Sequence, residues 1–203
     1  MVCEYKIEEY LVYKFILPVI DSNMYVIISD DNALIFDPHV NTEVSEMLKL
    51  RGVKKLVIVL THEHIDHISG VNYYRELFLC KVLGNSCCMD RVKDSKGNLA
   101  AFFDVLLMNC TQEETILIRS LLDKDYVCYV DEAFDDEITV VFNDLKLRLI
   151  ETPGHSLGSI CILVNDRYIF TGDTVVWGNK IITCLPGGSR KRYLEVTKLF
   201  WKI

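Results

Sequence analysis

Histidine is scarce in this sequence, and basic residues are in the minority. Only five histidines occur among 203 residues, and 22 lysines and arginines stand against 29 aspartates and glutamates. The formal net charge is therefore -7, and no stripe of lysine and arginine offsets it. This balance argues against a nucleic-acid-binding surface.

Long apolar runs and an export signal are also missing. The apolar run Leu11–Ile20 contains Lys14 and Pro18, and it is too short to span a bilayer. The N-terminal residues Met1–Lys6 lack the basic start of a signal peptide. We therefore expect no membrane association and a cytoplasmic location.

Paired cysteine motifs are absent, although the chain has eight cysteines. No Cys-x-x-Cys occurs, so neither a cysteine zinc site nor a thioredoxin-like motif is expected. Several cysteines lie inside apolar runs, as Cys161 does in Ser159–Leu163. We expect free, buried thiols in a reducing cytoplasm. Nothing near the adjacent pair Cys87 and Cys88 supports a redox role.

Half of the residues are apolar, which provides for a sizeable core, and the length favours a single domain over residues 1–203. Apolar, β-branched runs between turn residues predict strands over 24–29, 33–36, 53–60, 81–84, 127–130, 138–142, 145–150, 160–164 and 168–170. Helical spacing predicts helices over 41–50, with Thr42 as N-cap, and over 70–79. A helical insertion is expected at about 86–124, with helices over 99–108 and 113–122. Its role would be packing or a lid over the site.

Two segments repeat one pattern. Ile27–Asp37 and Ile162–Asp173 each have an apolar run, an acidic turn and a second apolar run that ends in phenylalanine, with an acid soon after. This repeat favours a two-sheet sandwich built by duplication.

Three of the five histidines fall in the segment His62–His67, directly after a predicted buried strand. In an extended segment, residues two apart point to the same side, so His62 and His64 can bind one ion together. A turn into a helix would bring Asp66 and His67 to a second position close by. Imidazole and carboxylate are the ligands that zinc prefers when sulfur is absent. A polar surface loop is the alternative, and the spacing, ligand types and strand end disfavour it.

Two later segments offer further ligands. His155 lies in the glycine-flanked loop Thr152–Ser159 between two predicted strands, and beside the three earlier histidines it is better interpreted as a fourth ligand than as a structural residue. Asp173 lies one tight turn past the strand that ends at Phe170. A carboxylate there is well placed to bridge two cations.

The succession of His-x-His-x-Asp-His, Thr-Pro-Gly-His and Thr-Gly-Asp resembles the metallo-β-lactamase fold superfamily, from about Met24 to the C-terminus. Asp37-Pro38 and Leu185–Gly188 resemble its glyoxalase II (hydroxyacylglutathione hydrolase) branch, which hydrolyses thioesters of glutathione. The resemblance implies an α/β fold with metals at one edge. The implied fold is a four-layer αββα sandwich of two mixed β-sheets flanked by helices.

The resemblance also implies a ligand set and a cofactor. The cofactor would be Zn²⁺, one or two ions, with Fe or Mn as alternatives. Six side chains would hold the metals: His62, His64 and His155 the first, Asp66 and His67 the second, with Asp173 bridging the two.

The sequence departs from the family at its second metal. That metal usually takes one further histidine past the Thr-Gly-Asp segment, and no histidine follows His155 here. We therefore expect the last strand to be missing, and either the chain is truncated or the second site is weak or filled otherwise. His39 is a candidate replacement ligand.

The implied function is hydrolysis of an ester or thioester by a metal-bound hydroxide. Asp66 would be the catalytic residue, either orienting the hydroxide or taking up a proton. Two dications outweigh Asp66, Asp173 and the hydroxide, which favours an anionic small-molecule substrate. Two alternatives remain: a mononuclear iron thiol dioxygenase, and a metal-binding module with a degraded second site.

Overall fold

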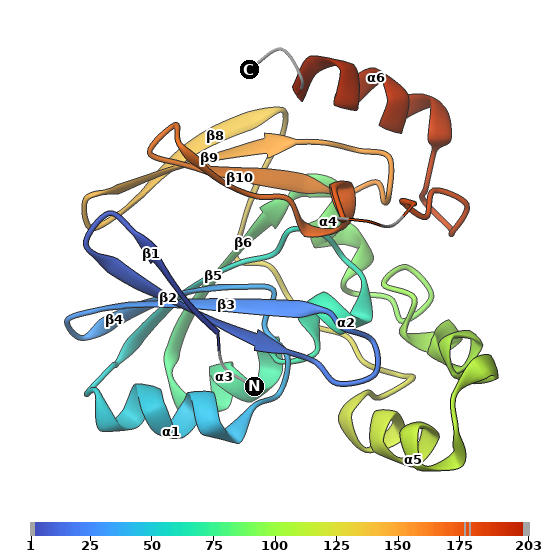
Figure 1. Cartoon of the computed structure of the whole chain (residues 1–203), viewed down its shortest axis with the longest axis horizontal. Helices are drawn as coiled ribbons and strands as arrows, with labels where there is room; N and C mark the ends of the chain where they lie inside the picture. The colour runs from blue at the N-terminus through green and yellow to red at the C-terminus, as the bar shows by residue number, and fades with distance from the viewer. Residues whose placement is uncertain (1–2, 177, 179, 201–203) are drawn as a thin grey trace.

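Two β-sheets packed face to face form the centre of the computed structural model, which describes residues 3–176, 178 and 180–200 (Figure 1). The strands of the larger sheet are, in order, β1 (Cys3–Ile7), β2 (Tyr10–Ile16), β3 (Asn23–Ser29), β4 (Asn32–Phe36), β5 (Lys55–Val59), β6 (Leu79–Asn85) and β7 (Glu132–Phe134). Those of the smaller sheet are, in order, β11 (Tyr168–Phe170), β10 (Ile160–Val164), β9 (Leu145–Glu151) and β8 (Glu137–Phe142).

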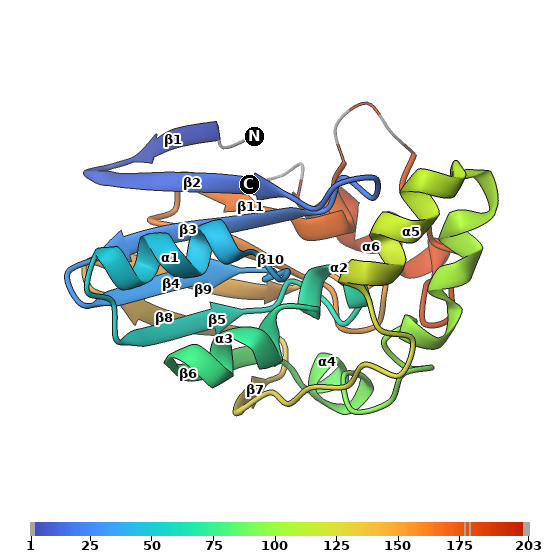
Figure 2. The ribbon, with the colours of Figure 1, turned by 90° about the horizontal axis from the view of Figure 1, so that it is seen from below.

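Helices cover the outer faces of both sheets. α1 (Thr42–Leu50) and α3 (Val71–Leu77) lie on the larger sheet, and α6 (Arg190–Phe200) lies over the smaller one (Figures 1 and 2). The expected αββα sandwich is confirmed. The absence of a last strand stays a prediction. The remaining helices are α2 (Ile65–Ile68), α4 (Ser86–Arg91), α5 (Gln112–Leu121) and the 3-10 helices η1 (Ala100–Asn109) and η2 (Gly172–Thr174).

The larger sheet changes strand direction at β4. Strands β1 to β4 pair antiparallel, whereas β4 to β7 pair parallel. The resemblance implies that the smaller sheet is mixed, but its described strands all pair antiparallel. Because β4 and β5 run parallel with Phe36 opposite Val59, the residues that follow both strands meet at one edge of the sheet.

The central strands are buried on both faces. On β3, Val26 packs into the core beneath the helices, whereas the next residue, Ile27, packs between the sheets. Ile58 and Val59 of β5 divide in the same way. Successive strand residues point to opposite faces, which explains why these strands are continuous apolar runs rather than alternating ones.

Three local predictions differ from the structure. Residues 127–130 form no strand, because side chains take their carbonyls: Asn72 Nδ2 donates to Val127 at 2.8 Å and Arg75 Nη2 to Tyr129 at 3.0 Å. The N-cap of α1 is Asn41, not Thr42, since Asn41 Oδ1 accepts from the Val44 amide. The segment expected as a helix over 99–108 is the 3-10 helix η1.

Cysteine burial is only partly as expected. The thiols of Cys88, Cys128 and Cys161 are buried, and burial raises the pKa of Cys128 to about 12 and that of Cys161 to about 11. Cys87 and Cys184 are exposed, contrary to the expectation.

Among the described residues, no helix combines the length and apolarity that a bilayer crossing requires.

Candidate metal centre

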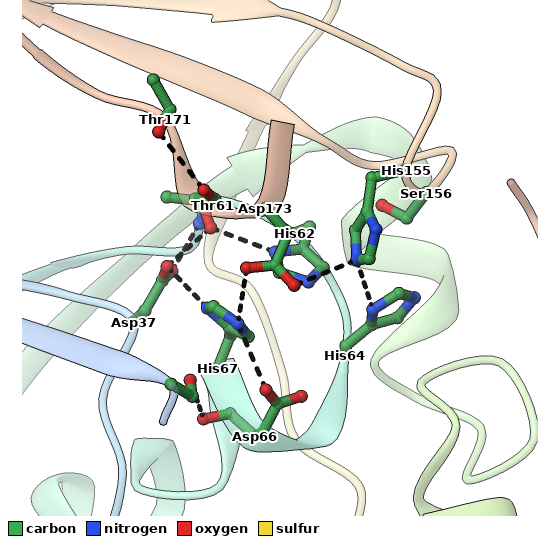
Figure 3. Close-up of polar contacts among 12 residues, drawn as sticks. Asp37, Thr61, His62, His64, Asp66, His67, His155, Ser156, Thr171 and Asp173 are labelled. Atoms are coloured by element: carbon green, nitrogen blue, oxygen red, sulfur yellow. Dashed lines mark hydrogen bonds and ion pairs between the residues drawn. The ribbon is translucent and has the colours of Figure 1, made fainter. Parts of the chain in front are cut away.

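The six predicted ligands lie together where β5 ends (Figure 3). The chain after β5 is extended as far as His64, whose φ is -66° and ψ 144°, and α2 begins at the next residue. Its first turn carries Asp66 and His67. Two loops of the other half of the chain bring His155, before β10, and Asp173, in η2 after β11.

His62, His64 and His155 form the first group. One ring nitrogen of each lies within 4.8 Å of the others, and His155 Nε2 is 3.0 Å from His64 Nδ1. Zinc bound tetrahedrally at about 2.0–2.1 Å separates its nitrogen ligands by about 3.3 Å. The three imidazoles are therefore spaced for a single ion.

Neighbouring oxygens fix two of these rings. His155 Nδ1 donates to the Ile182 carbonyl at 2.8 Å, which leaves the lone pair on Nε2. Thr61 Oγ1 accepts from His62 Nδ1 at 3.1 Å, so the lone pair of His62 is also on Nε2. For His64 and His155 to bind one ion, both facing nitrogens must be unprotonated. His64 then carries its proton on Nε2.

Asp66, His67 and Asp173 form the second group. His67 Nε2 lies 3.3 Å from Asp66 Oδ2 and 3.4 Å from Asp173 Oδ1, at ion-pair distance. The other oxygen of Asp173, Oδ2, is 3.4 Å from His155 Nε2. One carboxylate thus faces both groups with separate oxygens, which is the arrangement that a bridging ligand needs.

Asp37 organises both groups from behind. It accepts the Thr61 amide at 2.7 Å, the Thr61 hydroxyl at 2.6 Å and the His67 Nδ1 proton at 2.9 Å. One of its carboxylate oxygens also lies within 4.8 Å of a ring nitrogen of His62 and of one of His67, a spacing that could hold an ion. Because three donors already occupy these oxygens, we assign Asp37 to orienting His67 and Thr61 rather than to binding metal.

Burial and charge set opposite pKa shifts in the cluster. Burial lowers the pKa of His62 well below its usual value and that of His64 to about 3. Burial works the same way on His67, but the carboxylates of Asp66, Asp173 and Asp37 outweigh it and raise its pKa well above the usual value. Without a metal, His67 is therefore the cation of the site.

The two carboxylates are correspondingly held ionised. Burial would raise the pKa of Asp66 and of Asp173, but the charge on His67 outweighs burial and lowers both. Carboxylates that stabilise a positive charge on the His67 imidazole can stabilise the charge of a bound metal ion instead.

The donor atoms fit a metal. Nε2 of His62 and Nε2 of His67 are buried and have no hydrogen-bond partner among the described residues. Buried polar atoms normally have a partner, so these orphaned nitrogens call for one. Nitrogen and carboxylate donors without thiolate suit zinc, iron or manganese.

Gly172 lets the Asp173 turn approach the cluster. Its φ is +47°, and a Cβ there would lie 2.3 Å from Thr61 Oγ1. Only glycine fits this conformation and this contact without strain. The turn therefore packs its backbone against Thr61, which itself binds Asp37.

His39 does not join the cluster. It is buried, its Nδ1 lies 3.3 Å from the Val40 carbonyl, and burial lowers its pKa. Among the described residues, neither group of converging ligand atoms includes it. The structure therefore gives no support to His39 as a replacement ligand.

The family follows from a match of residues 17–195 to the model of the Metallo-beta-lactamase superfamily. The chain belongs to this superfamily. The probable metallo-hydrolase YqgX of Bacillus subtilis is 27% identical over 177 residues, which cover 86% of this chain and 76% of that protein. The hydroxyacylglutathione hydrolase of Rhizobium johnstonii is 27% identical over 65% of this chain, but the match spans only 38% of that protein's length.

Solved structures share the metallo-β-lactamase fold. The B3 metallo-beta-lactamase BLEG-1 superposes with a TM-score of 0.72 at 23% identity, over 98% of this chain and 84% of that one. TTHA1623 in a di-iron-bound form gives 0.71 at 19% identity, over 94% and 86%. ETHE1 from Myxococcus xanthus gives 0.66 at 18% identity, over 95% and 70%.

Sequence reasoning did not identify every residue that shapes this metallo-β-lactamase-type centre. The sequence gives Asp37 a place in the hairpin repeat and a resemblance to one branch but no role at the site, although it follows a hairpin just as Asp173 does. It gives no role either to Glu63, within the histidine motif, or to Thr61, directly before that motif. Their partners lie too far along the chain for a local pattern to indicate them.

Proposed function

We propose that this chain is a zinc-dependent hydrolase that cleaves an ester or thioester of a small anionic molecule. The observation that carries the proposal is the convergence of three imidazoles on one point, with Asp173 between them and the pair Asp66 and His67. His62, His64 and His155 would hold the first ion. Asp66, His67 and Asp173 would hold a second. Family membership and the metallo-hydrolases among the relatives support hydrolysis.

The chain's own residues would handle the proton. Bound zinc lowers the pKa of a coordinated water from about 16 to about 7 and polarises a carbonyl. Asp66, held ionised beside His67, can orient the attacking water and accept its proton. That proton would then pass to the departing alkoxide or thiolate, which leaves as an alcohol or thiol, while the acyl group keeps the water oxygen and leaves as a carboxylic acid. Asp37 keeps the Nε2 lone pair of His67 turned toward the site.

The relatives support a thioester as the substrate. Several proteins similar to this chain are hydroxyacylglutathione hydrolases. We therefore choose a hydroxyacylglutathione as the first substrate to test, followed by simple carboxylic esters. Specificity in such a fold resides in the site and its loops and not in the fold itself.

Asp66→Ala tests the assignment directly. We expect the zinc-loaded variant to lose about 100-fold or more of its hydrolytic rate, because a positioned proton acceptor contributes about 10²–10⁴-fold. Asp104→Ala is the matched control, since Asp104 is 62% exposed and, within the described part of the chain, pairs only with Arg119 on the surface. Thioester cleavage followed by thiol release measures both. Unchanged turnover in Asp66→Ala would rule out the role.

An iron thiol dioxygenase is the second candidate. The similarity to ETHE1 favours it, and His62, His64 and His155 alone would suffice to hold a single ion. Metal analysis of protein purified without added metal separates the two. Iron near one per chain, with oxygen uptake on thiol substrates, supports the dioxygenase. Metal bound without turnover of any ester, thioester or thiol supports a binding module.

The proposal includes a single domain over 1–203 in which residues 86–124 are an insertion beside the site. α4, η1 and α5 occupy that segment, and α5 lies at the same end of the sheets as α2 and α6 (Figure 2). Arg91, at the end of α4, reaches the histidine motif itself, as described next.

A further inference from the structure

Glu63 lies between two predicted ligands, yet its side chain points away from them into the protein. The carboxylate is 0% exposed. Its Oε2 accepts the Ser156 hydroxyl at 2.8 Å and the Gly158 amide at 3.1 Å. A Cβ on Gly158 would lie 2.5 Å from this oxygen, so the loop packs directly on the carboxylate. One side chain thus joins the segment of His62 and His64 to the loop of His155.

Arg91 supplies the counter-charge and a second connection. Its Nε lies 2.7 Å from Glu63 Oε1, at ion-pair distance though not in hydrogen-bond alignment, and its side chain is 21% exposed. Its Nη2 donates to the Pro186 carbonyl at 3.0 Å. The guanidinium lies against Gly187, where a Cβ would approach Nη2 to 3.2 Å. Arg91 therefore ties the loop 182–188 to Glu63.

The loop 182–188 acts on His155 in turn. Its Ile182 carbonyl accepts the His155 Nδ1 proton at 2.8 Å and so sets which nitrogen faces the metal. At the other end of the loop, Gly188 lies close enough that a Cβ would come within 3.1 Å of the His155 carbonyl oxygen. The loop thus contacts His155 through both its ring and its backbone.

We propose that Glu63 and Arg91 are positioning residues that hold His155 in place on the first metal. The pair connects the His62–His64 segment, the end of α4 and both loops beside His155, and no contact in it uses a metal ligand's own lone pair. This inference rests on the proposed metal site. Partners that orient a ligand from behind typically change metal affinity by about 10–100-fold when they are lost.

Arg91→Met tests the proposal through Zn²⁺ affinity, measured on metal-free protein in competition with a chromophoric chelator. We expect Zn²⁺ to bind the first site about 10–100-fold more weakly. Arg119→Met is the matched control. It removes an arginine from the same 86–124 segment, but Arg119 is 59% exposed and its only ion-pair partner among the described residues is Asp104. Its affinity should stay within about twofold of the unaltered protein, because exposed ion pairs contribute little.

Arg91→Lys guards against a folding failure. Arg91→Met leaves the Glu63 charge unpaired and buried, which can unfold the chain. Lysine keeps that charge paired, but its ammonium lacks the planar fork that serves two partners at once. We expect Arg91→Lys to fold and still to bind Zn²⁺ several-fold more weakly than the unaltered protein. Affinity equal to that of the unaltered protein, in folded Arg91→Met or in folded Arg91→Lys, overturns the proposal.

The ring proton of His155 provides a readout that does not depend on metal or turnover. Nitrogen NMR of the metal-free, unaltered protein should show His155 protonated at Nδ1, as its bond to the Ile182 carbonyl requires. In Arg91→Lys we expect a mixture of tautomers. A merely structural role would lower stability and leave both the tautomer and the affinity unchanged. If the unaltered protein binds no Zn²⁺, the proposed function fails, whereas tight binding in every folded variant overturns only the positioning role.

Discussion

Replacing Gly172 by alanine should both destabilise the protein and displace Asp173. The φ of +47° alone costs an L-residue about 1–2 kcal/mol. The new Cβ would also lie 2.3 Å from Thr61 Oγ1 and 2.7 Å from Thr61 Cβ, a contact that must push the η2 turn away. Overpacking of this kind costs about 1–3 kcal/mol more. We therefore expect a loss of about 2–5 kcal/mol in the free energy of unfolding.

Gly52→Ala separates the two terms. Gly52 has a φ of +74°, which is positive like that of Gly172, but nothing lies within 4 Å of its ideal Cβ. This substitution should cost only about 1 kcal/mol, because a stiffer unfolded chain offsets part of the backbone strain. Urea unfolding of the metal-free proteins measures both values. Their difference reports the contact with Thr61.

Metal stoichiometry completes the test. Because Asp173 faces both ligand groups, moving its turn should reduce the number of Zn²⁺ ions bound per Gly172→Ala chain. Gly52→Ala should bind the same number as the unaltered protein. Equal destabilisation by the two substitutions, together with unchanged stoichiometry, would refute the view that the close approach of Gly172 positions Asp173.

Two further predictions concern the cluster. Below about pH 6.5, the metal-free protein should lose about 1.4 kcal/mol of unfolding free energy per pH unit for each of His62 and His64, because the unfolded chain takes up protons that the folded state does not. His67 acts in the opposite direction, because its raised pKa adds stability that is lost as the pH rises through the pKa of the folded state. The free energy of unfolding, measured by urea titration at several pH values over pH 4–9, would contradict both effects if it did not change with pH. Asp37→Asn should weaken metal binding at His67 by about 10–100-fold, because an amide no longer enforces its Nδ1 proton, and calorimetric titration showing unchanged affinity would exclude that role for Asp37.

The sequence was sufficient for the local part of the site. His62, His64, Asp66 and His67 lie within six residues after a buried strand, so strand periodicity and a helix start already place them near one another. The glycine-flanked loop and the tight turn made His155 and Asp173 candidate ligands, but only the family resemblance assigned them to the same ions as the histidine motif. The structure brings both to the same point, and their role as ligands stays a prediction.

The contacts that support the site could not be predicted from the sequence. Glu63 and Arg91 are 28 positions apart, and Pro186 lies 95 positions beyond Arg91. A lone glutamate between two histidines and a lone arginine at a helix end carry no local pattern that pairs them. Such contacts depend on how α4 and the later loops fold over one another.

The fold shows the same division. The strands buried on both faces, such as β5 and β10, were predicted because their apolar runs are unbroken. The edge hairpin of β1 and β2 was not predicted, since polar residues interrupt its apolar positions on the exposed side. In residues 127–130, apolar character indicated a strand, but side chains from α3 took the carbonyls that a neighbouring strand would have used.

Exposure is unequal around the cluster. The side chains of His67 and His155 are 4% and 5% exposed, whereas those of Asp66 and Asp173 are 15% and 35% exposed. Of these four side chains, the two carboxylates are the more open to solvent, so they face whatever enters from that side. Without metal this entrance is negative and repels an anionic substrate, whereas bound dications reverse its sign. Metal binding would then control, through this change of charge, whether an anionic substrate enters the site.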